Sequence, residues 1–560
     1  MQRALVEGEN SGVPSSKLST LHKRLEGRVP IDSPKVIKGQ TLSKRRRELA
    51  EKKKSKKRAA QGLSQNVEPP EEQIDHLIEY YQTGKLEEAE SLAKSLIQQF
   101  PQHPFGWKAL GAVYKQMGKL SESLAPKQKA AELSPQDAEA HNNLGNTLQE
   151  LGRSDAAEAS CRRAIALKPE FAEAHNNLGA TLQALGRLDE AEASCKKAIA
   201  LQPEFAEAHC NLGSTLQESG RFDEAEVSLR QATVLKPNYA EAHYNLGATL
   251  QNLGRFDKAI ARYRQAIALK PDYAEAHNNL AASLQELGRI GEAEASYREA
   301  IALKPEDLKT HNQLLMCLFL QDKKSVFFDE LDYLINQDKP SATIGSLAYR
   351  SFLRYGLEKP NLFCSDPLNY VSHDDLKTRY DFEKTFVKKA KSILNGQQIS
   401  NRRQSLLENG TQTSGNIFDA TNNDTNEIEN IIRIEVEKYR TKFKRSEEGL
   451  IKKMPTEYSL YGWLISMKTG GNIKPHIHTE GWLSGSIYIN VPRKSKVDCG
   501  NLVVSLGEEK DAIDTRANEK KIISVVTGSM VLFPASLTHY TIPFESEQER
   551  IVLAFDVIQK

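Results

Sequence analysis

Three histidines near the end of the chain carry the strongest chemical signal in the sequence. His476 and His478 are separated by one residue in KPHIHTEGW, and His539 lies further along in LFPASLTHYTIP. Residues two apart on a β-strand point to the same face, so both imidazoles of the pair could reach one point. Imidazole nitrogen is a common ligand of divalent transition metals. The pattern predicts a metal site built on strands.

Short segments rich in β-branched and aromatic residues surround these histidines. They are YSLYGWLISM, SGSIYINVP, GNLVVSL, KIISVVTGSMVLFP and RIVLAFDVI, with Gly and Pro between them. Such a series is typical of an all-β sandwich or barrel. Apolar residues at helical spacing from Ile428 to Phe443 predict one amphipathic helix before it. The Asn, Gln, Ser, Thr and Gly of residues 396–427 favour long loops.

The order of these residues resembles the Fe(II)- and 2-oxoglutarate-dependent dioxygenases, in their prolyl-hydroxylase-like branch. The matching positions in this chain are His476, Tyr488, Asn490, Gly500, His539 and Arg550. The resemblance implies a double-stranded β-helix (jelly-roll) fold over 455–560. It also implies that His476, His478 and His539 bind Fe(II), and that Arg550 and Tyr488 bind the far carboxylate of 2-oxoglutarate. Arginine suits that role because its planar fork matches a carboxylate and stays charged.

One position departs from that family, because His478 stands where the hydroxylases have an aspartate. In this respect the chain resembles a smaller branch that reads His-x-His followed by SGxxY, here SGSIY at 484–488. Iron(II) with open positions is usually held by two histidines and a carboxylate. A third neutral imidazole raises the net charge of the site by one, which makes metal binding electrostatically less favourable. Asp498 or Glu480 could supply a carboxylate instead, provided that a neighbouring loop bends.

A 34-residue period organises the first half of the chain. Prolines recur in this register at 101, 135, 169, 203, 237, 271 and 305, together with histidines from 141 to 311 and small residues at fixed places. Small residues let two helices approach closely, and the proline ends the second helix. Each unit is therefore a helical hairpin that buries its apolar face by stacking on its neighbours. The periodic histidines lie a whole hairpin apart, which favours a packing or surface role over metal binding.

These hairpins resemble tetratricopeptide repeats, in seven units of which the first two are irregular. Residues 308–321 are predicted to form a closing helix. Asparagines also recur on the first helix of successive hairpins, which lines the concave side in this repeat class. Such a ladder can hold the backbone of an extended peptide, as in the O-linked N-acetylglucosamine transferases, whose repeats these resemble. The predicted peptide-binding residues are Asn143, Asn177, Asn211, Asn245 and Asn279. The alternative is that the asparagines recur only because the repeats share a common sequence, without a role in binding.

Charge, hydropathy and cysteine content limit the classes of protein to which the chain can belong. The stretch KRRRELAEKKKSKKR at 44–58 is strongly basic, whereas the whole chain has a formal net charge of +2. Residues 1–69 are expected to be a disordered tail, either simply solvated or able to contact nucleic acid or an acidic partner. No apolar run is long enough to span a membrane, and the N-terminus lacks a signal-peptide core. The six cysteines form no CxxC pair, which fits reduced thiols in the cytoplasm.

The predicted architecture is an all-α tetratricopeptide repeat solenoid followed by a mostly-β double-stranded β-helix. The expected boundaries are 1–69 for the tail, 70–321 for the repeats, 322–454 for a connecting region and 455–560 for the β-helix core. The leading functional hypothesis is an Fe(II)- and 2-oxoglutarate-dependent hydroxylase whose repeats recruit a protein or peptide. The alternatives are a non-catalytic adaptor, and a three-histidine iron dioxygenase that does not use 2-oxoglutarate.

Overall fold

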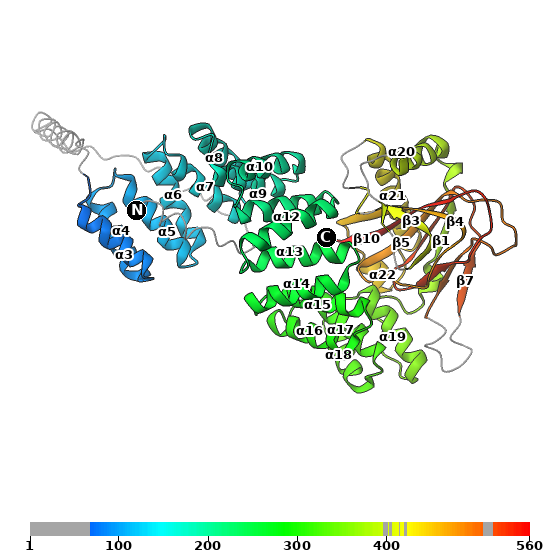
Figure 1. The fold of residues 1–560 in the computed structure, drawn as a ribbon. Coiled ribbons are helices and arrows are strands. Elements are labelled where there is room, and N and C mark those ends of the chain that lie inside the picture. Colours follow the sequence, from blue (N-terminus) through cyan, green and yellow to red (C-terminus); the bar gives the residue numbers. More distant parts are fainter. Residues whose placement is uncertain (1–67, 396–400, 403–405, 414, 419–422, 508–518) are drawn as a thin grey trace, which may run out of the picture. The chain divides into compact units, whose positions relative to one another are not determined.

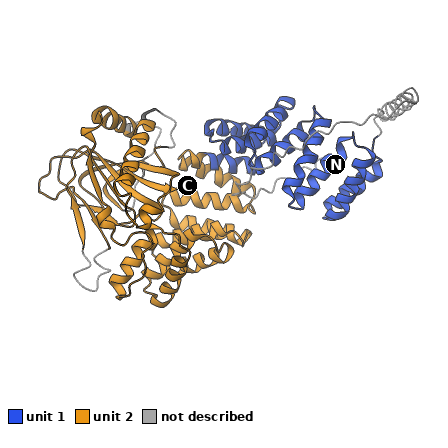
Figure 2. Cartoon of the chain, turned by 180° about the vertical axis from the view of Figure 1, so that it is seen from behind, with its two compact units in different colours: residues 1–215 blue, residues 216–560 orange. Residues whose placement is uncertain are grey.

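The computed structural model describes residues 68–395, 401–402, 406–413, 415–418, 423–507 and 519–560 (Figure 1). The basic run at 44–58, and with it the predicted tail up to residue 67, lies outside the described residues. The chain divides into two compact units, residues 1–215 and 216–560 (Figure 2). No helix among the described residues has the length and apolar character needed to cross a membrane.

Helices follow the predicted 34-residue period from α3 to α16, as seven consecutive pairs. Their bounds are α3 (Glu71–Gln82), α4 (Leu86–Gln99), α5 (Pro104–Gln116), α6 (Leu120–Leu133), α7 (Ala138–Glu150), α8 (Ser154–Leu167), α9 (Ala172–Ala184), α10 (Leu188–Leu201), α11 (Ala206–Glu218), α12 (Phe222–Leu235), α13 (Ala240–Asn252), α14 (Phe256–Leu269), α15 (Ala274–Glu286) and α16 (Ile290–Leu303). The turn inside a pair needs a left-handed residue, which Gly152 supplies with a φ of 71°. The sequence period is thus the period of the structure.

Small residues set the distance between the two helices of a pair. In the α9–α10 hairpin, a Cβ added to Gly179 would overlap Sγ of Cys195 and lie 3.3 Å from the carbonyl oxygen of Ala191. Ala191, Cys195 and Ala198 are completely buried on the facing helix. Close packing of this kind leaves no room for one more methyl group.

We expect Gly179→Ala to destabilise the repeats, although alanine is the better helix former by about 1 kcal/mol. Overpacking against Cys195 should cost about 1–3 kcal/mol and so outweigh that gain. The free energy of unfolding, measured by denaturant titration with circular dichroism, should fall. The double variant Gly179→Ala/Cys195→Ala removes the opposing sulfur atom and should recover most of the loss. A double variant as unstable as the single one would show that this contact does not set the helix separation.

The periodic histidines have the structural role that the sequence predicts. In each of six repeats, Nε2 of the histidine lies within hydrogen-bond distance of the carbonyl oxygen of the proline six residues earlier, as for His175 and Pro169 at 3.0 Å and His311 and Pro305 at 3.1 Å. The other pairs are His141 with Pro135, His209 with Pro203, His243 with Pro237 and His277 with Pro271. Each imidazole therefore joins a first helix to the turn before it.

Helices continue beyond the predicted closing helix. That helix forms as α17 (Leu308–Leu320), but α18 (Lys324–Asn336) and α19 (Ala342–Tyr355) follow it in a stretch that the sequence analysis assigned to a connecting region. The buried residues of α18 (Phe327, Leu331 and Leu334) have helical spacing. Ser341 caps α19 by accepting a hydrogen bond from the backbone N–H of Ile344. These two helices were not predicted because they do not follow the 34-residue period.

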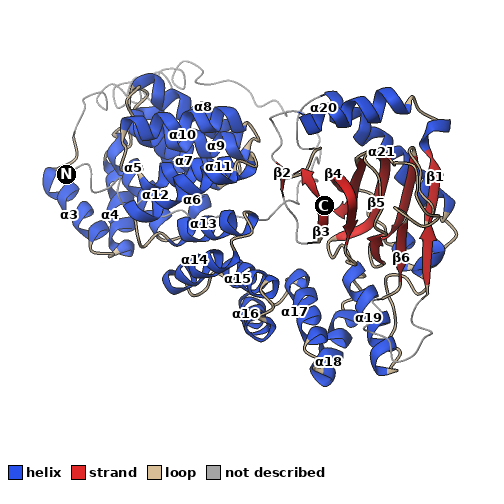
Figure 3. Cartoon of the chain, turned by 45° about the vertical axis from the view of Figure 1, so that its right-hand side comes forward, coloured by secondary structure: helices blue, strands red, loops and turns tan. Residues whose placement is uncertain are grey.

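The C-terminal domain contains two β-sheets, as a double-stranded β-helix requires (Figure 3). The strands are β1 (Ser372–Asp375), β2 (Asn401–Arg402), β3 (Leu407–Thr413), β4 (Tyr458–Ile473), β5 (Gly481–Asn490), β6 (Leu502–Ser505), β7 (Lys520–Ile523), β8 (Ser529–Pro534), β9 (Thr538–Thr541) and β10 (Arg550–Gln559). One sheet has the order β1-β8-β5-β10-β4-β3-β2 and the other β7-β6-β9. The segment KIISVVTGSMVLFP forms two strands rather than one, because Gly528, with a φ of 98°, lies in a turn between the sheets.

Both faces of the seven-stranded sheet are covered. The predicted amphipathic helix forms as α21 (Asn423–Lys442), and its apolar residues share a core with the outer side chains of β10, such as Leu553 and Phe555. The alternate residues Val552 and Ala554 pack in a second core with the three-stranded sheet. Shorter elements are η1 (Pro367–Tyr370), η2 (Leu376–Thr378), η3 (Glu383–Lys388), α20 (Lys389–Asn395) and α22 (Gly449–Lys452). The cavity described next opens into the core between the sheets.

Candidate metal centre

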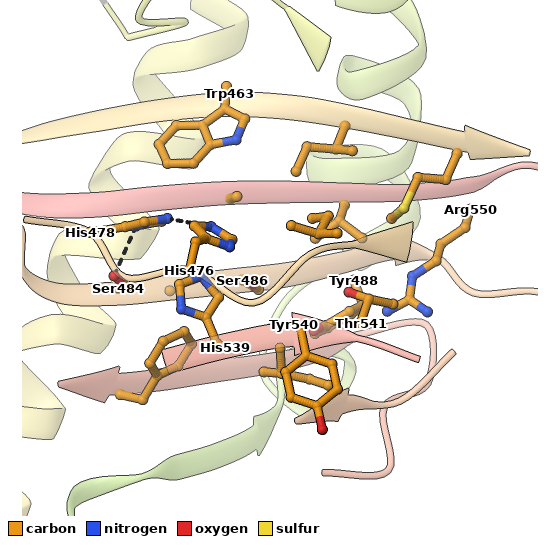
Figure 4. Close-up of a pocket in the computed structure, with 18 residues that line it drawn as sticks. Trp463, His476, His478, Ser484, Ser486, Tyr488, His539, Tyr540, Thr541 and Arg550 are labelled. Atoms are coloured by element: carbon orange, nitrogen blue, oxygen red, sulfur yellow. Dashed lines mark hydrogen bonds between the residues drawn. The ribbon is translucent and has the colours of Figure 1, made fainter. Parts of the chain in front are cut away.

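The three predicted histidines converge at one end of this cavity (Figure 4). One ligand nitrogen from each of His476, His478 and His539 lies within 4.8 Å of the other two. His539 belongs to β9, whereas His476 and His478 lie in the loop after β4. Backbone hydrogen bonds fasten that loop to β9, since the N–H of His539 donates to the carbonyl oxygen of His476 at 2.9 Å and the reverse bond is 3.2 Å long. The fold thus holds the triad together through main-chain pairing.

Each imidazole has a hydrogen-bond partner for Nδ1, so Nε2 is the nitrogen that remains for a metal. Nδ1 of His476 lies 2.8 Å from the carbonyl oxygen of Lys474, and Nδ1 of His539 lies 3.3 Å from that of Leu537. A carbonyl oxygen only accepts, so these contacts place the proton on Nδ1. The Nε2 atoms of His476 and His478 are 3.0 Å apart. Orientation by a hydrogen bond on the far nitrogen is typical of metal-bound histidines.

The third imidazole is oriented by a carboxylate that the sequence analysis did not select. Nδ1 of His478 lies 2.6 Å from Oδ1 of Asp556, and Ser484 Oγ donates to the same oxygen at 2.8 Å. Asp556 was detectable in principle, because Arg550, Val552, Ala554 and Asp556 alternate along β10 and so share its inner face. A carboxylate on that face is an exception among buried strand residues.

Burial favours the neutral form of His476 and His539, which is the form that binds a metal. Desolvation, with the neighbouring His478, lowers the pKa of His476 to about 4. The same cause lowers the pKa of His539 well below its usual range, with the neighbouring His476 as the next contribution. A charged imidazole is disfavoured in a site that already brings three such rings together.

Arg550 lies in the same cavity with unused hydrogen-bond donors. Its side chain is 1% exposed, and Nε and Nη2 have no hydrogen-bond partner among the described residues. Nη1 donates to the carbonyl oxygen of Gly500, where an added Cβ would come within 2.7 Å of the guanidinium. The buried Tyr488 ring packs 5.2 Å from the guanidinium carbon. Desolvation lowers the pKa of Arg550. Two buried, unpaired N–H groups beside each other suit a carboxylate.

Neither of the alternative carboxylates reaches the triad. Glu480 forms an ion pair with Lys309 at 2.5 Å. Asp498 accepts a hydrogen bond from Nδ2 of Asn501 at 3.3 Å. In the described part of the chain, the three histidines form the one group of at least three His, Cys, Asp or Glu side chains close enough to hold an ion, and it contains no carboxylate.

The predicted asparagine ladder lies half-buried on the first helices of its repeats. Asn177 Nδ2 donates to Oδ1 of Asn142, and Asn211 Nδ2 donates to Oδ1 of Asn176, both at 2.9 Å. Asn279 Nδ2 donates to the hydroxyl oxygen of Tyr244 at 3.0 Å. These amides thus connect successive repeats within each compact unit. The remaining predicted positions on these helices are Asn143 on α7 and Asn245 on α13.

Comparison with protein families identifies both parts of the chain. A family model described as "Putative 2OG-Fe(II) oxygenase" matches residues 461–556, which include the histidine triad and Arg550. Models described as TPR repeat or tetratricopeptide repeat match 111–152, 138–171, 170–236, 229–261, 252–288 and 274–307. The chain joins tetratricopeptide repeats to a 2OG-Fe(II) oxygenase-family domain. The two resemblances inferred from the sequence, and the predicted fold class, are thereby confirmed.

The similar solved structures cover only part of this chain. A structure titled as the APC/C hetero-tetramer Cut9-Hcn1 is 22% identical, covers 43% of this chain and has a TM-score of 0.40; this chain spans 48% of its length. YrrB, titled as a TPR protein with an unusual peptide-binding site, is 24% identical over 33% of this chain and 95% of its own, with a TM-score of 0.28. A thermophilic TPR protein of Thermus thermophilus is 29% identical over 33% of this chain and all of its own, with a TM-score of 0.29. No curated protein matches the chain.

The residues of the oxygenase-family domain fit the groups that its family implies. Three imidazoles whose ligand nitrogens lie within 4.8 Å of one another suit Fe(II), which accepts imidazole ligands. The buried Arg550 guanidinium suits the far carboxylate of a 2-oxo acid, because its unpaired N–H groups lose hydration without gaining protein partners.

Proposed function

We propose that the C-terminal domain is an Fe(II)- and 2-oxoglutarate-dependent dioxygenase that hydroxylates a protein or peptide. The observation that supports this most directly is the cavity shared by the histidine triad and Arg550. One end of the cavity offers nitrogen ligands, and Arg550 offers an unpaired buried cation. A dicarboxylate that chelates a metal through its 2-oxo acid end needs both features.

The residues of this chain have separate tasks in that reaction. Bound iron(II) supplies the reaction of dioxygen with 2-oxoglutarate and substrate, in which one oxygen atom enters a C–H bond and the other enters succinate as carbon dioxide leaves. His476, His478 and His539 hold the ion. Arg550, with the hydroxyl of Tyr488, binds the far carboxylate and so orients the co-substrate. Trp463, which lines the cavity and whose ring centroid is 5.6 Å from that of His478, excludes water on the β4 side.

The repeats supply the reason to propose a macromolecular substrate. Tetratricopeptide repeats typically bind proteins or peptides, and a helical-hairpin array offers a long surface for an extended chain. The half-buried asparagines Asn143, Asn177, Asn211, Asn245 and Asn279 are the proposed contacts with the peptide backbone. The bonds of Asn177, Asn211 and Asn279 to neighbouring repeats would hold these amides in fixed orientations, which lowers the entropy cost of binding.

One alternative keeps the iron but dispenses with 2-oxoglutarate. The observation that favours it is the triad itself, which contains no carboxylate among its three members. In that case Arg550 would bind a carboxylate of the substrate. The two functions differ in whether 2-oxoglutarate binds at the metal.

Anaerobic titration of the full-length protein with Fe(II) and then with 2-oxoglutarate separates these functions. A visible metal-to-ligand charge-transfer band that requires both additions is the expected result. Iron binding without the band would favour the 2-oxoglutarate-independent oxygenase. Failure to bind iron would reject both and leave a repeat adaptor whose β-helix has lost its metal.

A further inference from the structure

A buried carboxylate stands directly behind one of the three histidines. Asp556 lies on β10 with 8% of its surface exposed, and its Oδ1 is 2.6 Å from Nδ1 of His478. Ser484 Oγ lies 2.8 Å from that oxygen and 3.1 Å from the same ring nitrogen (Figure 4 shows the contact of Ser484 with His478). A strand, a loop and a neighbouring strand thus supply one connected group of three side chains.

The surroundings of Asp556 give this carboxylate few ways to compensate its charge. Its residue partners on the paired strands are Tyr461 on β4 and Ser484 on β5. His478 is the one basic side chain within ion-pair distance of it among the described residues. A buried anion without a strong cationic partner is costly. A divalent cation on the far side of the His478 ring would compensate that charge.

His478 differs from the other two imidazoles in this respect. Nδ1 of His476 and Nδ1 of His539 face neutral carbonyl oxygens. A carboxylate on Nδ1 fixes the ring orientation as a carbonyl does, and it also makes Nε2 a stronger electron donor. Of the three imidazoles, His478 is thus the one whose Nδ1 faces a carboxylate, and it stands where the chain lacks a carboxylate ligand.

We propose that Asp556 is a positioning residue for the metal site. The site lacks one negative charge because a histidine stands in place of a carboxylate ligand, and Asp556 restores that charge through its contact with His478. The proposal builds on the proposed function in that the same triad binds the metal. Ser484 assists by donating a hydrogen bond to Asp556, which helps to fix the position of the carboxylate. The Ser-Gly sequence at the start of SGSIY has a structural reason, because Gly485 leaves room for the Phe555 ring, which an added Cβ would overlap.

Metal affinity of the full-length protein tests this proposal. Isothermal titration with Fe(II) under anaerobic conditions, repeated with Co(II), should give a dissociation constant about 10–100-fold higher for Asp556→Asn than for wild type. Asparagine has the same shape and can still accept a hydrogen bond, so the loss would reflect the charge. Asp498→Asn removes a carboxylate of the same domain that does not line the cavity and should leave the affinity unchanged. Equal affinities of wild type and Asp556→Asn would overturn the proposal.

A measurement on the metal-free protein keeps this inference separate from the proposed function. The nitrogen chemical shifts of His478 report which ring nitrogen carries the proton. The wild type should show the proton on Nδ1, and Asp556→Ala should show a mixture of both tautomers. Absence of the proton from Nδ1 in the wild type would reject the role of Asp556 regardless of metal binding. If the tautomer result holds but wild type binds no metal, the proposed dioxygenase function fails while the contact stands.

Discussion

Replacing His539 by alanine is expected to abolish detectable Fe(II) binding by the full-length protein. The residue contributes one of three ligand nitrogens from β9, and no described carboxylate lies close enough to take its place. Loss of an outer partner of a metal-bound histidine already costs about 10–100-fold in affinity. Loss of the ligand itself should therefore cost more than about 100-fold, or roughly 2.7 kcal/mol. Anaerobic calorimetry and metal analysis after desalting would measure it.

His373→Ala is a matched control for this variant. His373 belongs to β1 of the same domain, contacts Ser529 Oγ at 3.1 Å and does not line the cavity. Its removal should leave Fe(II) affinity within about twofold, since surface and peripheral substitutions rarely change a distant site. Circular dichroism should show that both variants fold. Unchanged iron binding by a folded His539→Ala variant would place the metal elsewhere.

The cluster of three histidines could be predicted because each histidine lies on or next to a segment with a clear strand pattern. His476 and His478 follow β4, and His539 on β9 pairs with His476. Asp556 was not predicted, because no local sequence pattern connects it to the histidines. It acts through a neighbouring ring on a different strand, and neither short spacing nor the family pattern marks such a contact. Only the inward alternation from Arg550 along β10 points to it.

In the fold, too, elements that repeat along the sequence could be predicted, whereas elements that occur once were harder to predict. The repeats from α3 to α16 could be placed from the 34-residue period, because each pair of helices solves the same packing problem. Helices α18 and α19 follow no period and were missed. The strands β1, β2 and β3 come from outside the predicted β-helix core, and they extend the seven-stranded sheet at its two ends. Such added strands depend on tertiary pairing more than on local sequence.

Replacing Arg550 by methionine should abolish 2-oxoglutarate binding without destabilising the protein. Methionine has a similar length and no charge, so it removes a guanidinium that is 1% exposed and has two nitrogens without partners. Replacing a buried charge by an apolar side chain of similar volume is often neutral or stabilising. The melting temperature of the metal-free protein should therefore stay the same or rise. The dissociation constant for 2-oxoglutarate should increase by about 30-fold or more, since removing one partner of a buried charge pair costs roughly 2–5 kcal/mol.

Arg550→Lys separates the contribution of charge from that of shape. Lysine keeps the positive charge but lacks the planar fork, so it should restore part of the 2-oxoglutarate affinity lost in the methionine variant. Fe(II) affinity should remain close to wild type in both, because Arg550 is not among the ligand residues. If both variants bind 2-oxoglutarate as tightly as wild type, Arg550 does not contact the co-substrate. The buried cation would then serve a substrate carboxylate, as the oxygenase that does without 2-oxoglutarate requires.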